Sequence, residues 1–117
     1  MEIALPVRDW TFIDATIDNT VAVAAQSGEL PTAAYGFALR EAGWEAARNH
    51  PKSVQSAAGW PPENEELTLD LPVEAWKFIV DQLRRWDGAD ALVRPRQEGD
   101  PESRFLQLAQ RLESIAG

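Results

Sequence analysis

The sequence predicts an α+β fold in which a short two-stranded antiparallel ribbon packs against about four helices. The main observation is a stretch that occurs twice: Leu5–Ile13 returns 66 positions later as Leu71–Ile79, with identical Leu, Pro, Val, Trp, Phe and Ile. A repeat that includes two tryptophans and two prolines indicates an internally duplicated strand-helix-helix unit. We therefore expect a single domain, 1–117, with pseudo-repeats 1–50 and 67–117 joined by the connection 51–66.

Each copy of the repeat should begin at the end of a short strand. Apolar residues alternate in Glu2–Leu5 and in Leu67–Leu71, as in strands that bury one face, and a proline follows each strand. Two such strands cannot form a stable sheet alone. We expect them to pair with each other and to be covered by helices on their apolar side.

The first helix should begin near Arg8, carry an apolar stripe around Trp10, and end before Gly28. Phe12 lies opposite that stripe, as does Phe78 in the second copy of the repeat. Both phenylalanines therefore need a second covering surface. That surface is either the second helix of each unit, in which case they belong to the core, or another copy of the chain.

The second helix should run from about Pro31 to Asn49. Its cleanest apolar stripe consists of Tyr35, Leu39, Ala42 and Ala46. Gly36 and Gly43 lie seven residues apart within it and indicate close packing against a neighbouring helix. In the connection that follows, Ser53–Ala58 predicts one or two helical turns.

Two more helices are expected after the second strand. The third should end at Asp87–Gly88, and Ala91–Val93 is a candidate short strand. The fourth should begin with Asp100 as its N-cap and Pro101 at its first position, a strong start signal.

Composition limits the possible functions. A chain of 117 residues with a net charge of −8 lacks the clustered basic residues that nucleic acid or an anionic membrane would require. The absence of cysteine excludes disulfides, thiolate metal sites and cysteine nucleophiles. No secretory signal or long apolar run is present, so we expect a soluble, cytoplasmic protein.

A pair of strand-helix-helix units resembles the ribbon-helix-helix family of DNA-binding proteins, in which the paired strands read the major groove. In that family the exposed face of the ribbon carries base-reading residues such as Arg, Lys, Asn, Gln or Thr. The corresponding positions of this chain are Glu2, Ala4, Glu66, Thr68 and Asp70. Because carboxylates repel phosphate, we expect at most a shared topology, without nucleic-acid binding.

Acidic pairs are the nearest approach to a metal site. Asp14 and Asp18 lie four residues apart on the first helix, and Glu41 and Glu45 lie four residues apart on the second. Helical bundles can bind Mg²⁺ or a di-metal centre through such carboxylates. Asp14 borders the apolar stripe, so it needs a partner, either an arginine or a metal. Because acidic proteins often carry such pairs on solvated faces, we expect no metal and no cofactor.

No catalytic constellation is present in the sequence. His50 is the only histidine and follows a predicted helix end, where a charged ring would interact favourably with the helix dipole. No serine lies in a nucleophile-elbow motif. We expect a non-catalytic protein.

Tryptophan and arginine are enriched at binding hot spots, and several such residues lie off the apolar stripes. The candidate contact patch consists of Phe37, Arg40, Trp44 and Trp60. We expect a small acidic protein that acts through protein contacts, first with a second copy of itself as a homodimer. The alternatives are an inhibitor or immunity-type neutraliser of a basic protein, and a Mg²⁺-dependent helical hydrolase.

Overall fold

The computed structural model describes residues 1–53 and 59–116, which form two strands and four helices. Their order is β1 (Glu2–Pro6), α1 (Val7–Gln26), α2 (Leu30–Arg48), β2 (Glu66–Asp70), α3 (Val73–Val93) and α4 (Arg104–Ala116). The predicted α+β class with a small antiparallel ribbon is therefore confirmed. The predicted turns at Ser53–Ala58 lie almost entirely outside the described residues.

The chain divides into two compact units, Met1–Leu71 and Pro72–Gly117. The first contains the ribbon with α1 and α2, and the second contains α3 and α4. The single domain and the internal duplication stay predictions.

The ribbon pairs β1 with β2 so that Ile3 lies opposite Leu69 and Leu5 opposite Leu67. These four side chains are buried, and the residues between them are exposed, as the sequence alternation predicts. Backbone bonds extend the pairing beyond the strands at both ends. The Val7 amide donates to the Glu65 carbonyl at 2.8 Å, and the Met1 amino group donates to the Leu71 carbonyl at 2.8 Å.

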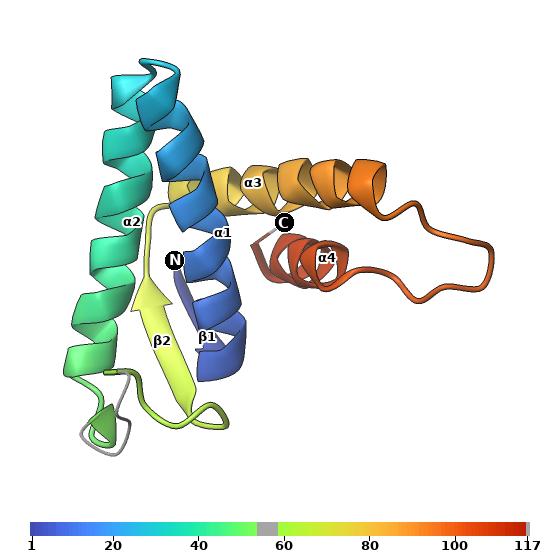
Figure 1. The fold of residues 1–117 in the computed structure, drawn as a ribbon. Helices are drawn as coiled ribbons and strands as arrows, with labels where there is room; N and C mark the ends of the chain where they lie inside the picture. The colour runs from blue at the N-terminus through green and yellow to red at the C-terminus, as the bar shows by residue number, and fades with distance from the viewer. Residues whose placement is uncertain (54–58, 117) are drawn as a thin grey trace. The chain divides into compact units, whose positions relative to one another are not determined.

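Helices α1 and α2 lie side by side, joined by the turn at residues 27–29 (Figure 1). Gly28 in this turn has a φ of 77°, which favours glycine. The buried face of α2 consists of Gly36, Leu39, Gly43 and Ala47. The predicted stripe was therefore wrong in part: Leu39 is buried, but Tyr35 is exposed and the alanines are half-buried. Glycines contribute no hydrophobic side chain, so an apolar pattern does not mark them as the contact face.

The link between α2 and β2 is held by the His50 ring. Its Nδ1 accepts a hydrogen bond from the Lys52 amide at 3.0 Å, and its Nε2 lies 3.0 Å from the Glu66 carbonyl oxygen. A carbonyl only accepts, so Nε2 carries the proton and Nδ1 does not. In this arrangement the His50 ring joins the link to β2, while its expected role at the helix dipole stays a prediction.

In the second unit, α3 continues through Gly88 to Val93, with the Arg94 amide donating to the Asp90 carbonyl at 2.8 Å. The predicted end at Asp87–Gly88 and the strand at Ala91–Val93 were both wrong. Gly88 has no positive φ and remains helical. The pair Leu92 and Val93 lies at the exposed end of this helix, with 86% and 80% of their surface accessible.

The start of α4 also differs from the prediction. Ser103 is the N-cap: its carbonyl accepts from the Gln107 amide at 3.0 Å, and its Oγ accepts from the Leu106 amide at 3.1 Å. Asp100, the predicted cap, instead closes a turn by accepting from the Gln97 amide at 2.7 Å. Within the described part of the chain, no helix is both long and apolar enough to cross a membrane.

Candidate protein-contact surface

Three of the four predicted patch residues lie together on one face of α2. Phe37, Arg40 and Trp44 are spaced three, four and seven residues apart, which places them on adjacent turns of the same helix face. The Phe37 ring meets the Trp44 ring edge-on, with centroids 5.7 Å apart and planes at 83°. The guanidinium carbon of Arg40 lies 4.9 Å from the Trp44 ring centroid, in a cation–π arrangement.

Helix α1 fixes the Arg40 guanidinium from its other side. Arg40 Nε lies 3.1 Å from Asp14 Oδ1, and Nη2 lies 3.3 Å from Asp14 Oδ2, so this contact is bidentate. Nη1 also donates to Asp18 Oδ1 at 2.7 Å. The side chains of Arg40 and Asp14 are 18% and 14% exposed, whereas that of Asp18 is 58% exposed.

The electrostatics of this cluster favour the charged arginine. Burial alone would lower the pKa of Arg40, but the hydrogen bond to Asp14 and the charges of Asp14 and Asp18 outweigh it and hold that pKa above its ordinary value. The partner that Asp14 was expected to need is therefore Arg40. A guanidinium fixed between two carboxylates and an indole face gives the patch a rigid centre.

Trp60 belongs to the same region. It lines a hollow of about 270 Å³ together with Trp44, Ala47, Arg48 and Gly59. Gly59 has a φ of 85°, a conformation that favours glycine. The structure therefore gathers all four predicted patch residues; that they contact a partner stays a prediction.

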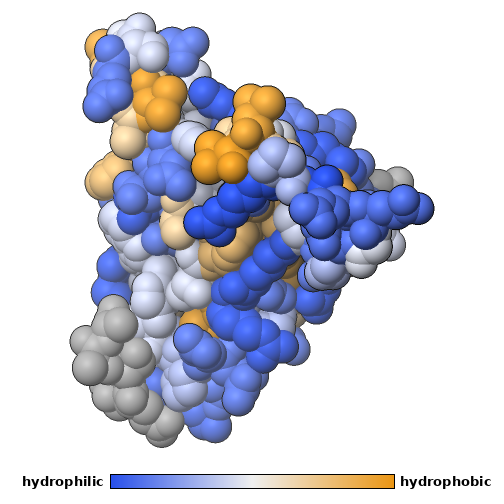
Figure 2. Space-filling model, turned by 45° about the vertical axis from the view of Figure 1, so that its right-hand side comes forward, coloured by the Kyte–Doolittle hydropathy of each residue, from blue (hydrophilic) through white to orange (hydrophobic). Residues whose placement is uncertain are grey.

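The patch is part of a longer stripe of exposed and half-buried residues, which we call the α2 outer face. It follows from helical periodicity and consists of Leu30, Ala33, Ala34, Phe37, Arg40, Glu41, Trp44 and Arg48. Leu30 and Phe37 expose 66% and 46% of their surface. On the face shown in Figure 2, hydrophobic residues form separate groups among hydrophilic ones.

The candidate metal ligands do not converge. Asp14 and Asp18 both contact Arg40, whereas Glu45 lies in a groove beside β2 with Thr68 and Asp70. Across residues 1–53 and 59–116, no three carboxylate or histidine side chains are grouped closely enough to hold a metal ion. A cation at Asp14 and Asp18 would have to displace the arginine.

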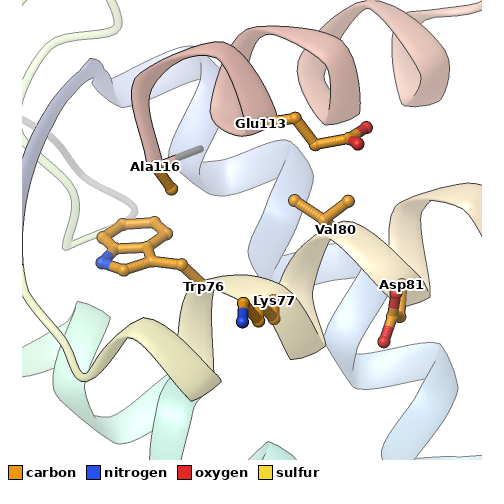
Figure 3. Close-up of a pocket in the computed structure, with 6 residues that line it drawn as sticks. All are labelled: Trp76, Lys77, Val80, Asp81, Glu113 and Ala116. Carbon is orange, nitrogen blue, oxygen red and sulfur yellow. The ribbon is translucent and has the colours of Figure 1, made fainter.

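The second unit contains a groove of about 350 Å³ between α3 and α4 (Figure 3). Val80 of α3 faces Glu113 of α4 across it, and Ala116 lies over Trp76. Glu113 is already ion-paired with Arg84. This groove has apolar walls and a charged rim, without the convergent polar groups that fix a small ligand.

Sequence reasoning missed the histidine link and the role of Arg40 as the partner of Asp14. The available signal for Arg40 was its spacing, since it lies between Phe37 and Trp44 on one face of the helix. Comparisons of the chain with protein-family models, curated proteins and solved structures give no match.

Proposed function

We propose that this protein is a non-catalytic, acidic protein that acts by binding protein through the α2 outer face, and that it binds first to a second copy of itself. The observation that carries this proposal is the ordered cluster of Phe37, Arg40 and Trp44 on an accessible helix face. Aromatic residues and arginine dominate the binding energy of many interfaces. Such residues bind best when their side chains are already fixed, because less conformational entropy is lost on binding.

The buried ion pair of Arg40 with Asp14 supports the proposal. Both side chains are largely buried and charged, and the free energy of desolvating them offsets much of their attraction, so a stabilising role alone explains the pair poorly. It orients the guanidinium over Trp44, next to the exposed Phe37 ring. A purely structural role would not require the Phe37 ring at this exposed position.

Multi-angle light scattering over a range of protein concentrations tests this proposal. We expect a concentration-dependent dimer for the wild-type protein and a monomer for Phe37→Ala and Trp44→Ala. Leu92→Ala combined with Val93→Ala is the matched control, because it removes apolar side chains that are even more accessible and lie in the other unit. Thermal unfolding must show that each variant remains folded. A wild-type protein that stays monomeric at high concentration would contradict self-association.

A second candidate is supported by the exposed face of the ribbon. Glu2, Glu66 and Asp70 are exposed there, and together with the net charge of −8 they would attract a basic partner protein and speed its association. Substituting Glu2 and Glu66 by Gln should then weaken capture of basic proteins from the native lysate at low salt. Unchanged capture would remove this candidate. The hydrolase alternative is not favoured, because Arg40 already occupies Asp14 and Asp18.

A further inference from the structure

We propose that the two copies associate through α2 helices that lie antiparallel across a twofold axis. This inference rests on the proposed function and names the arrangement of the partner. The distribution of side-chain size and charge along the α2 outer face supports this arrangement. A twofold interface uses the same surface of both copies, so each contact that α2 can make must be complementary to α2 itself.

Side-chain size is distributed unevenly along this face. Ala33 and Ala34 lie in the first turns of α2, whereas Trp44 lies in its second half, with Trp60 beside it. An antiparallel pair places each Trp44 over the small residues of the second copy. A parallel pair would place Trp44 against Trp44 and alanine against alanine, which leaves a clash at one end and a gap at the other.

The charges at the two ends of α2 also favour the antiparallel arrangement. Glu29 is the N-cap position of α2, but its carboxylate makes no cap hydrogen bond, and Arg48 is the last residue of the helix. Both are exposed, and neither makes an ion pair with any part of the chain that the structure describes. The offset that pairs Trp44 with the second copy's Ala33 also pairs Arg48 with Glu29. The parallel alternative would bring like charges together.

The centre of the pair fits the same offset. It places Phe37 of each copy against Arg40 of the other, so the aromatic ring meets the outer side of a guanidinium that Asp14 and Trp44 hold in place. One helix pair forms a small interface, so we expect micromolar affinity. The offset is thus defined by three contacts, each of which occurs twice.

A charge-swap experiment tests the arrangement. Glu29→Arg and Arg48→Glu each place like charges at both ends of an antiparallel homodimer. Exposed ion pairs contribute up to about fivefold each in an equilibrium constant, so we expect each variant alone to dimerise about tenfold or more weakly at low salt. An equimolar mixture of the two variants should form a heterodimer of near wild-type affinity, because both end contacts are then attractive. The double variant Glu29→Arg with Arg48→Glu should recover as a homodimer.

The outcomes separate the two proposals. Glu41→Arg is the matched control, because it changes a charge on the same face without reversing an end contact. If the wild-type protein dimerises and Trp44→Ala abolishes this, but the mixture does not recover, the antiparallel arrangement is wrong and binding through the α2 outer face stands. A strictly monomeric wild type overturns self-association as a whole. At 1 M salt, the difference in affinity between the mixture and the single variants should disappear, because screening shortens the range of charge interactions to about 3 Å.

Discussion

Trp10 of α1 packs directly against the backbone of α2 at Gly43, and no side chain larger than hydrogen fits between them. A Cβ added at Gly43 would lie 2.6 Å from Cε2 and 2.8 Å from Cζ2 of the indole ring. Two turns earlier, a Cβ at Gly36 would lie 2.7 Å from Cγ2 of Val21. The two glycines therefore set the distance between the helices, and with it the reach of Arg40 to Asp14.

Replacing Gly43 by alanine should destabilise the protein in spite of alanine's better helix propensity. The added methyl overlaps a rigid indole ring, and overpacking of this kind costs about 1–3 kcal/mol. Gly88→Ala is the matched control, since Gly88 is also helical but has nothing within 4 Å of an added Cβ. It should stabilise by about 0.5–1 kcal/mol. Urea unfolding measures both changes, and a neutral Gly43→Ala would show that the helices can separate freely.

The Arg40 ion pairs should differ in strength according to their burial. Asp14→Asn removes the charge from a pair that is largely buried, and we expect a loss of about 1–2 kcal/mol, between the values typical of surface and buried pairs. Asp18→Asn changes an exposed carboxylate and should cost less than about 0.5 kcal/mol. The measurement is the free energy of unfolding in urea for both variants. Equal losses of unfolding free energy would show that the bidentate contact with Asp14 stabilises the protein no more than the exposed contact with Asp18.

Prediction from sequence succeeded where a pattern depends on large side chains. The alternation of Ile3, Leu5, Leu67 and Leu69 predicted both the ribbon and its buried face, because strand periodicity follows directly from the backbone. The Phe37, Arg40 and Trp44 grouping followed from helical spacing in the same way. The contact face of α2 could be inferred only from its glycines. Its exact position depends on Trp10 of α1, and the apolar pattern of α2 does not show that this side chain packs there.

The His50 ring makes two hydrogen bonds that one substitution can separate. In His50→Asn, the shorter amide can still accept from the Lys52 amide two residues on, as asparagine commonly does in turns, but it cannot reach the Glu66 carbonyl. His50→Ala loses both bonds. We expect His50→Ala to cost about 1–2 kcal/mol and His50→Asn about half as much. Equal unfolding free energies for the two variants would mean that only the bond to Glu66 matters.

The ion pair of Lys52 with Glu65 should make stability depend on pH in the acid range. The hydrogen bond from Lys52 lowers the pKa of Glu65 below its ordinary 4.5; burial opposes this, and the charge of Lys52 adds to it. A lowered folded-state pKa contributes stability that is present above the unfolded pKa of 4.5 and is lost as pH falls through the folded-state value. Glu65→Gln should therefore reduce the acid-induced loss of stability. Parallel pH profiles of the two proteins would contradict this.

The errors in the second unit share a physical cause. Asp87–Gly88 looks like a helix end, but Gly88 stays helical and the Asp87 carboxylate accepts from Arg96 and Ser103 after the chain has turned back. The exposed Leu92 and Val93 resemble a strand only by composition. The two partners of Asp87 lie nine and sixteen residues further along the chain, so the sequence around Asp87 does not predict these contacts.

The start of α4 gives the sharpest contrast between the sequence signal and the structure. Ser103→Ala removes the oxygen that accepts from the Leu106 amide and should cost about 1 kcal/mol, the usual value for an N-cap. Asp100→Ala should cost less, because Asp100 Oδ2 stabilises only an exposed turn through the Gln97 amide. Ser103→Asp restores an acceptor for the Leu106 amide but adds a charge beside Asp87, so it should recover only part of the loss. Hydrogen exchange at the first amides of α4, read together with the unfolding free energy, distinguishes the two caps: faster exchange in Asp100→Ala than in Ser103→Ala would restore Asp100 as the start of the helix.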